Sequence, residues 1–485
     1  MNLVTDTLLE VGRTTPMKVA VATGDGRQIT YGELDRLSGQ LANVLTRRYR
    51  VTTGDRVAIH ARKSPEILAL NLACARAGAI FLPLNSGYTD REVRDLLDDA
   101  TPVLLIRDET IEHATPRIGL ERLISEALEC PADFDDLVCD EHAPAAMLFT
   151  SGTTGRAKGA VLTHGNLASN CRTLNEVWGF TSEDVVVHVL PLFHTHGLFV
   201  AAYCALSSGA SLLMLESFEV DEVLRRLGDA TVFMGVPTHY VRLLGCADLS
   251  RETTSSIRLF LSGSAPMRRS THHEFTARTG HAIVERYGMT ETGMITSNPI
   301  DGTHRVGTVG TALPGVTVRL DDAPVGGIEV TGPNVFSHYW NRPELRETEF
   351  TRDGWFKTGD LGTLDDDGYL EIVGRAKDLI ISGGYNVYPK EVEMVLDSFG
   401  GVAESAVIGL ADDDLGEAVV AVVVAAPDAR VDAPSLIDFA RAQLARYKVP
   451  RRVVVVDELP RNAMGKVQKV QLRRQLSVSE GEVTH

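Results

Sequence analysis

The chain has 485 residues, more than one ordinary hydrophobic core organises, so two or more domains are expected. Its hydrophobic fraction of 44% is typical of globular proteins. Its formal net charge of −17 argues against binding to nucleic-acid phosphates or to anionic lipid, so neither a nucleic-acid nor a membrane partner is expected.

Cysteine usage and the first residues favour a cytoplasmic protein. The six cysteines form no CxxC pair and no zinc-like spacing with histidine, so we interpret them as reduced thiols. The first segment, MNLVTDTLLEVGR, carries acids where a signal peptide needs cations. Serines and a glycine interrupt the longest apolar run, 198–215, which favours a helix followed by a strand over a membrane span.

The first half of the chain alternates signals for helices and strands. Thr30 and Glu33 have the spacing of a capping box, and leucines follow them at helical intervals. Pro65 suits the first turn of a second helix, Gly78 its end, and Thr163 the cap of a third. Strands are predicted at 57–59, 80–84 and 146–149. This alternation predicts an α/β fold.

The sequence changes character from about Ile328. Strand-like runs such as GYLEIVG and AVVAVVVAA now alternate with acidic turns, and the polar stretch 374–378 separates two of them. We therefore predict a large domain of mixed sheets and helices at 1–376 and a small α+β domain at 377–485.

The segment TSGTTGRAKG, at 150–159, is the most distinctive loop. Its glycines and hydroxyl residues let backbone N–H groups converge on an anion, and Lys158 adds a mobile positive charge. It is not a Walker A loop, because GxxxxGK[ST] is absent. A loop of this composition is also typical of a flexible connection, so by itself it leaves both interpretations open.

Six further motifs follow the loop in order along the chain. They are LSGSAP at 261–266, ERYGMTET at 285–292, KTGDLG at 357–362, GRAKD at 374–378, SGGYN at 382–386 and PRNAMGK at 460–466. Together with the loop, this series resembles the acyl-adenylate-forming superfamily of acyl-CoA synthetases, adenylation domains and beetle luciferases. The resemblance covers nearly the whole chain. It has one departure: Ala157 stands where the family usually has proline, and we expect a looser loop as a result.

The resemblance implies an enzyme that uses ATP, Mg²⁺ and coenzyme A. In this family a carboxylate attacks the α-phosphate of ATP and expels pyrophosphate, and a thiol then takes the acyl group from the acyl-adenylate. Because like-charged species must meet, catalysis depends on positioning and on cations placed where charge develops.

The resemblance also implies a nucleotide site. The loop would hold the β- and γ-phosphates through Thr150, Ser151, Gly152, Thr153, Thr154, Gly155 and Lys158. Gly263, Ser264 and Ala265 would lie along the adenine, with Tyr287 on its face. Asp360 would accept hydrogen bonds from the ribose hydroxyls, and Arg375 would reach the ribose or a phosphate. The alternative for Asp360 is a simple Asx-turn.

Three residues are implied in catalysis. Thr290 would contact the α-phosphate, and Glu291 would ligate Mg²⁺ as a hard oxygen donor. Lys466 would bridge the attacking carboxylate and the α-phosphate. The alternatives are a surface acid for Glu291 and a solvated lysine for Lys466.

Two further features concern coenzyme A. Lys377 stands at the position where the family's small, mobile domain swings between the two half-reactions. Ser382, Gly383 and Gly384 would then border the pantetheine channel.

Arg286 indicates which carboxylic acid the enzyme activates. Most family members have a small or neutral residue at this position, next to the acyl pocket. Arg286 would either pair with a carboxylate of the chain, such as Glu285, or bind a second carboxylate on the substrate. His194 and Ser262 would assist it. Within the superfamily the chain is most similar to malonyl-CoA synthetases, and we predict malonate as the substrate, with the preference over methylmalonate left open.

Four alternatives remain at the level of the sequence. The chain could activate another short or medium carboxylic acid, or load a carrier protein in trans. It could act as an adenylate-forming oxygenase, like luciferase. A non-catalytic nucleotide-binding protein would require a broken motif, and Lys466, Glu291 and Asp360 are all present. Oligomeric state is not predicted.

Overall fold

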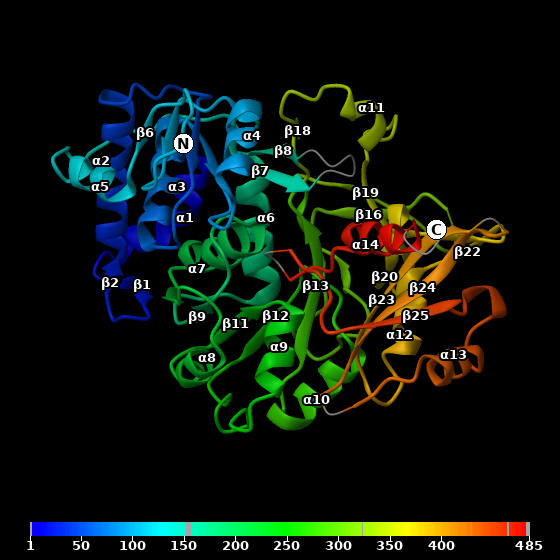
Figure 1. The fold of residues 1–485 in the computed structure, drawn as a ribbon. Coiled ribbons are helices and arrows are strands. Elements are labelled where there is room, and N and C mark those ends of the chain that lie inside the picture. Colours follow the sequence, from blue (N-terminus) through cyan, green and yellow to red (C-terminus); the bar gives the residue numbers. More distant parts are fainter. Residues whose placement is uncertain are drawn as a thin grey trace. The chain divides into compact units, whose positions relative to one another are not determined.

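The computed structural model describes residues 2–151, 157–322, 324–412, 414–427, 429–462 and 465–481. The chain forms two compact units (Figure 1). Unit 1 contains Met1–Val318 and Val330–Phe356, and unit 2 contains Arg319–Glu329 and Lys357–His485. The predicted boundary at 376/377 lies inside unit 2 by this division. It was placed on a polar break and a hinge motif, and the hinge at Lys377 stays a prediction.

A nine-stranded sheet forms one half of unit 1, in the order β15-β14-β13-β12-β11-β9-β10-β1-β2. Its strands are β1 (Val19–Thr23), β2 (Gln28–Thr30), β9 (Val185–His188), β10 (Ser211–Met214), β11 (Val232–Gly235), β12 (Leu259–Ser262), β13 (Ile283–Met289), β14 (Gly293–Ser297) and β15 (Thr311–Ala312). The run from β1 through β13 is parallel and apolar, as strands covered on both faces are.

A seven-stranded sheet forms the other half, in the order β18-β8-β7-β4-β3-β5-β6. Its strands are β3 (Arg56–Ile59), β4 (Ile80–Pro83), β5 (Leu104–Ile106), β6 (Arg117–Ile118), β7 (Pro144–Ser151), β8 (Ala157–Thr163) and β18 (His338–Tyr339). The predicted strands at 57–59, 80–84 and 146–149 correspond to β3, β4 and β7.

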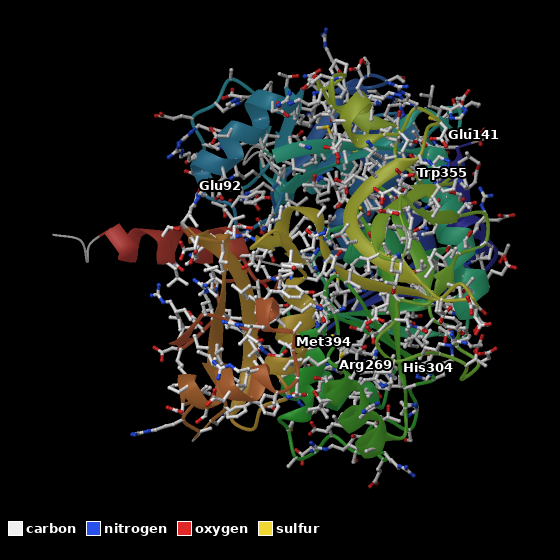
Figure 2. The ribbon with its side chains drawn as sticks, turned by 90° about the vertical axis from the view of Figure 1, so that its right-hand side faces the viewer. Glu92, Glu141, Arg269, His304, Trp355 and Met394 are labelled. Carbon is white, nitrogen blue, oxygen red and sulfur yellow. The ribbon has the colours of Figure 1, made fainter. Side chains whose placement is uncertain are left out.

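Capping residues and glycines set the ends of several helices in unit 1. They are α1 (Leu3–Thr14), α2 (Tyr31–Arg47), α3 (Pro65–Ala77), α4 (Asp90–Ala100), α5 (Leu120–Leu128), α6 (His164–Trp178), the π-helix η1 (His196–Ala202), α7 (Tyr203–Ser207), α8 (Val220–Leu227), α9 (Pro237–Leu244), α10 (Arg269–Thr279) and α11 (Leu345–Glu349). The capping box of Thr30 and Glu33 is confirmed, and Glu92 completes another on α4 (Figure 2). Gly78 ends α3 with a φ of 68°, which favours glycine.

One hydrophobic core spans both sheets of unit 1. Its largest fully buried side chains include Trp178, Tyr31, Phe81 and Phe260. Tyr31 at the start of α2 donates a hydrogen bond to the carbonyl of Ala210 at 2.6 Å, so its buried hydroxyl is satisfied.

Unit 2 contains two smaller sheets. The four-stranded sheet has the order β16-β17-β19-β20, with β16 (Thr317–Leu320), β17 (Gly326–Thr331), β19 (Phe356–Leu364) and β20 (Leu370–Arg375). The second sheet contains β21 (Ile380–Ser382), β22 (Tyr385–Val387), β23 (Val402–Asp412), β24 (Gly416–Ala425) and β25 (Arg452–Val456). The helices are α12 (Pro389–Leu396), α13 (Ala433–Arg441) and α14 (Lys469–Gly481), with short turns η2 (Ala376–Asp378) and η3 (Arg446–Lys448).

The apolar run on β24 is buried on both faces. Val419, Ala421 and Val423 pack with residues of α12 and α13, whereas Val420 and Val422 pack with Leu472 of α14. This alternation explains why the run is hydrophobic without interruption. The mixed sheets of unit 1 and the α+β character of unit 2 confirm the predicted fold class. None of the helices in the described ranges has the length and apolar character that crossing a membrane requires.

Candidate active site

Several of the predicted residues of unit 1 meet at one edge of the nine-stranded sheet. Strands β9, β11, β12 and β13 are parallel, so the residues that follow their carboxyl ends gather there. Ser262 is the last residue of β12 and residues 263–265 follow it, and the turn of Thr290 and Glu291 follows β13. The segment after β9 contributes 194–196. Ligands of open α/β sheets bind at this edge.

Glu291 lies at the centre of a hydrogen-bonded cluster. Its side chain is buried, and Oε1 accepts hydrogen bonds from the hydroxyl of Thr150 at 3.2 Å and from that of Tyr339 at 2.8 Å. Thr290 accepts a hydrogen bond from the hydroxyl of Thr195 at 3.4 Å. The structure thus brings the first residue of the loop beside the proposed magnesium ligand. A carboxylate and hydroxyls are the hard oxygen donors that suit Mg²⁺.

Lys158 lies beside the same cluster. It is buried to 8% exposure, its ammonium group contacts Glu349 Oε1 at 2.7 Å, and it lies 5.1 Å from the centre of the Tyr339 ring. A buried lysine needs such a partner. The predicted phosphate-binding residues Gly152, Thr153, Thr154 and Gly155 lie outside the described residues, as does the side chain of Ser151.

Tyr339 was missed in the sequence because no motif spacing marks it. Burial and the neighbouring Glu291 raise the pKa of its hydroxyl, so it stays a neutral donor. We expect Tyr339→Phe to raise the Mg²⁺ concentration for half-maximal activity about tenfold, since residues that orient a metal ligand have effects of this size. A magnesium titration of initial rates measures this. Tyr49→Phe is the matched control, because Tyr49 donates to Glu126 at 2.8 Å. Equal effects in both variants would contradict the role.

Arg286 is buried, and no carboxylate of the described residues pairs with it. Its exposure is 3%, and its Nε and Nη2 atoms have no hydrogen-bond partner among the described residues. Glu285 precedes it on β13, and consecutive side chains of a strand point to opposite faces, so Glu285 does not provide the pairing that the sequence left open. Burial lowers the pKa of Arg286 to about 10, which leaves it charged at neutral pH.

The neutral polar side chains of Tyr240 and His196 interact electrostatically with Arg286, whereas Ser262 is paired with Glu285 in the parallel β12–β13 ladder and so lies on the other face of the sheet. Ser262 is 1% exposed, and its hydroxyl has no hydrogen-bond partner in the described part of the chain. Burial and the charge of Arg286 lower the pKa of His196 well below its usual value, so this ring is neutral. Its Nδ1 lies 3.4 Å from the hydroxyl of Ser264, and its backbone N–H donates to His194 Nδ1 at 3.3 Å. His194 therefore lies near the predicted pocket, half-buried.

Lys63 is a second residue that the sequence did not reveal. It lies between β3 and α3 and donates hydrogen bonds to the carbonyls of His188 and Leu215, both at 2.7 Å. It thereby links the seven-stranded sheet to the ends of β9 and β10. His188 Nε2 in turn donates to the carbonyl of Gly197 at 2.8 Å, in the segment of His194 and His196. Only the register of the two sheets brings these residues together, so no local signal could have identified Lys63.

Unit 2 carries the remaining nucleotide-binding predictions. Asp360 on β19 pairs with Arg375 on β20, with Asp360 Oδ1 at 2.9 Å from Arg375 Nε. Asp360 is buried, and Arg375 is half-buried. Antiparallel pairing places these two residues directly opposite each other, which the sequence did not predict. This ion pair joins β19 to the edge strand β20 of the four-stranded sheet and engages Oδ1 of Asp360.

Lys466 lies at the end of a tight turn in unit 2. Its backbone N–H donates to Asn462 Oδ1 at 2.9 Å, and the backbone N–H of Asn462 donates to the carbonyl of Lys466 at 3.0 Å. Arg461 and Val467 form an antiparallel bridge across this turn. Lys466 itself is exposed. Asn462 thus makes two hydrogen bonds with the backbone of Lys466 in the described part of this segment.

The hinge and coenzyme A predictions also fall in unit 2. Burial lowers the pKa of Lys377, which lies in η2. Ser382 pairs with Tyr385 across a hairpin whose two turn residues, Gly383 and Gly384, have φ values of 58° and 80°. The two glycines are thus required by the turn itself, and a role in binding coenzyme A stays a prediction.

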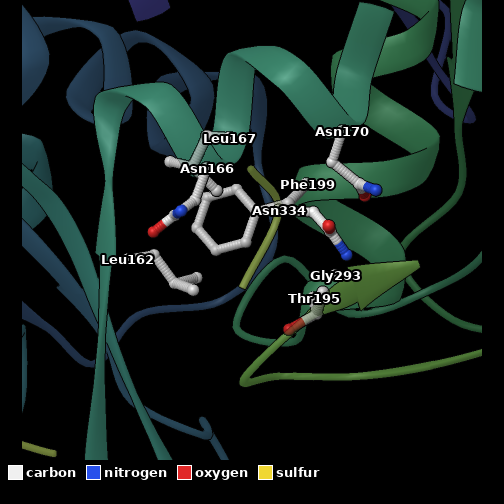
Figure 3. A pocket seen from close by; sticks show the side chains of 8 residues that line it. All are labelled: Leu162, Asn166, Leu167, Asn170, Thr195, Phe199, Gly293 and Asn334. Carbon is white, nitrogen blue, oxygen red and sulfur yellow. The ribbon is translucent and has the colours of Figure 1, made fainter. Parts of the chain in front are cut away.

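A separate small cavity lies behind the Glu291 cluster. It measures about 10 Å³ and is lined by Leu162, Asn166, Leu167, Asn170, Thr195, Phe199, Gly293 and Asn334 (Figure 3). This volume suits about one water molecule, so the cavity is not the nucleotide site. Within the described ranges, no group of three or more histidine, cysteine or acidic residues has the arrangement of a metal site.

Comparison with known proteins places this geometry in context. Residues 8–340 match the family model described as AMP-binding enzyme, and residues 391–466 match the AMP-binding enzyme C-terminal domain. The malonate–CoA ligase of Arabidopsis thaliana is 36% identical over 94% of this chain and 86% of its own length. The feruloyl-CoA synthase of Amycolatopsis sp is 37% identical over 95% of this chain and 96% of its own length.

Among solved structures, ATP-bound MatB from Rhodopseudomonas palustris is 46% identical, with a TM-score of 0.94 and coverage of 98% of both chains. The resemblance stated from the motifs is thereby confirmed. Both family models and these full-length relatives lead to one conclusion: the chain belongs to the AMP-binding enzyme family.

Proposed function

We propose that the protein is an AMP-forming acid–thiol ligase that converts malonate and coenzyme A to malonyl-CoA with ATP. In the first half-reaction a malonate oxygen attacks the α-phosphorus, forms malonyl-adenylate and displaces pyrophosphate. In the second, the thiol of coenzyme A attacks the acyl carbon and displaces AMP. Mg²⁺ neutralises phosphate charge when it is bound.

The residues of unit 1 divide into two groups in this proposal. Thr150, Lys158 and Thr290 bind the phosphates, and Glu291 holds Mg²⁺ with Tyr339 as its hydrogen-bond donor. The exchange of Glu349 for a phosphate as the partner of Lys158 accompanies ATP binding. Gly263, Ser264, Ala265 and Tyr287 form the adenine side, and the loop residues 151–155 complete the phosphate side.

Unit 2 supplies the ribose-binding pair Asp360 and Arg375 and the catalytic Lys466. Lys466 stabilises negative charge on the attacking carboxylate and the α-phosphate. Rotation about Lys377 then exchanges this lysine for the hairpin of Ser382, Gly383 and Gly384, which admits the pantetheine thiol. A cytoplasmic location follows from the reduced cysteines and is part of the same proposal.

The observation that supports the choice of malonate is the buried Arg286, for which the part of the chain that the structure describes offers no carboxylate partner. An unpaired charge in an apolar pocket is unfavourable, and a second substrate carboxylate is the group that satisfies it bidentately. Ser262 is paired with Glu285 and so lies on the other face of the strand pair from Arg286, and its predicted role with the acid stays a prediction. A monocarboxylic acid leaves the guanidinium unpaired, at a cost of about 2–5 kcal/mol.

The test is pyrophosphate exchange across a panel of acids with the wild-type protein. Malonate should exceed propionate, butyrate and ferulate by about 100-fold in kcat/KM, which corresponds to about 3 kcal/mol. Trapping malonyl-CoA with free coenzyme A separates this activity from loading of a carrier protein. Equal rates with propionate and malonate would overturn the substrate assignment. Methylmalonate is included because pockets discriminate a single methyl group weakly.

A further inference from the structure

Gly263 lies directly against the guanidinium group of Arg286. Strands β12 and β13 are parallel, and Ser262 is paired with Glu285, so the next residue of each strand also lies side by side. A Cβ atom at position 263 would lie 2.4 Å from Cζ, 2.5 Å from Nη1 and 2.7 Å from Nε of Arg286. Non-bonded carbon atoms are at their optimum at about 3.5–4.0 Å, so no side chain fits here with Arg286 in its present position.

The backbone conformation does not explain this glycine. Gly263 is not among the residues with positive φ, whereas its neighbour Ser264, which has a side chain, has a φ of 71°. An L-residue could therefore adopt the backbone angles at position 263 without strain of that kind. The space taken by the guanidinium group is therefore one physical reason for glycine at this position. This reason differs from the adenine contact that the family motif implies for Gly263.

The orientation of Arg286 depends on packing, because no ion pair fixes it. Among the described residues no carboxylate pairs with it, and its Nε and Nη2 atoms have no hydrogen-bond partner. A planar guanidinium group binds a carboxylate through two parallel hydrogen bonds only when its plane has the correct orientation. A neighbour that fixes this plane therefore determines whether the group recognises the acid.

We propose that Gly263 is a positioning residue that fixes the orientation of the Arg286 guanidinium group, and that this contact restricts the enzyme to dicarboxylic acids. This inference rests on the proposed function, because it assumes that Arg286 binds the second carboxylate. It adds that position 263 must be glycine for steric reasons when residue 286 is arginine. With a small residue at 286, the three atoms that lie nearest to a methyl group at 263 are absent.

The experiment is a double-mutant cycle of Gly263→Ala and Arg286→Ala, measured with malonate and propionate. We expect Gly263→Ala to lower kcat/KM for malonate about 100-fold, since misplacing a binding group by about 1 Å has effects of this size. In the Arg286→Ala background the same substitution should cost at least tenfold less in kcat/KM for propionate than it costs the wild-type background with malonate, and any effect on the adenine contact is measured separately by the KM for ATP. Gly228→Ala is the matched control, because a Cβ at Gly228 meets no atom within 4 Å. The KM for ATP is recorded for every variant.

Each outcome separates the inference from the proposed function. If wild type does not prefer malonate, the proposed function fails first. If wild type prefers malonate but Gly263→Ala is equally harmful with arginine and with alanine at 286, only the inference fails. Should the single variant fold poorly, thermal unfolding decides: relief of the clash in the double variant should restore the midpoint to that of Arg286→Ala. A double variant that remains less stable than Arg286→Ala would overturn the inference.

Discussion

Replacing Arg286 with alanine is expected to lower kcat/KM for malonate by about 100- to 1000-fold, or about 3–4 kcal/mol. The physical reason is the loss of a buried, charge-assisted contact to the second carboxylate, which then lies desolvated in the pocket without a cation. Propionate, which has a methyl group in place of that carboxylate, should keep its rate or gain, because an unpaired cation is removed from its binding site.

The readout for Arg286→Ala is pyrophosphate exchange with both acids at fixed ATP. Arg242→Ala is the matched control, since Arg242 lies exposed on α9 and should leave both rates unchanged. A parallel loss with malonate and propionate would mean that Arg286 supports the fold of the pocket and does not recognise the acid. The ratio of the exchange rate with malonate to the exchange rate with propionate therefore decides between these two roles of Arg286.

Replacing Lys466 with alanine is expected to abolish the first half-reaction and preserve the second. Formation of malonyl-adenylate should fall by about 100- to 1000-fold, the usual effect of removing one group that stabilises transition-state charge. Preformed malonyl-adenylate should still react with coenzyme A at a rate close to wild type, because the lysine interacts only with the adenylation transition state in this scheme.

Two separate assays measure the effect at Lys466: pyrophosphate exchange for adenylation, and release of AMP from added malonyl-adenylate and coenzyme A for thioester formation. Arg474→Ala on the neighbouring helix α14 controls for loss of a positive charge near the C-terminus, because Arg474 is exposed. Equal losses in both assays would indicate that Lys466 stabilises unit 2 and is not specific to adenylation.

Local features of the fold could be predicted from the sequence because neighbouring residues produce them. Thr30 and Glu33 form their capping box within one helical turn, and Gly78 ends α3 through its own positive φ. The strand near 57–59 and the helix after Pro65 are likewise set by short apolar patterns and turn residues. The predicted α/β class follows from the alternation of such elements.

Contacts between distant segments could not be predicted, because they depend on strand register and on the packing of one sheet against another. Gly263 meets Arg286 only through the pairing of β12 with β13. Tyr339 reaches Glu291 only because β18 pairs with β8 at the edge of the seven-stranded sheet. For the same reason the sequence left open whether Arg286 pairs with a carboxylate of the chain. The roles of the motif residues in binding and catalysis remain predictions that the experiments above test.

The path of the chain has a consequence for synthesis on the ribosome. Residues 319–329 of unit 2 are made before residues 330–356 of unit 1, and the chain passes between the units three times. Unit 1 therefore lacks its edge strand β18 until residue 339 emerges from the ribosome. Strands β16 and β17 cannot complete their four-stranded sheet until β19 and β20 have been made, up to Arg375. The folding of the two units during synthesis therefore overlaps in time. A chain truncated between residues 319 and 375 has unpaired strand edges, which favour aggregation.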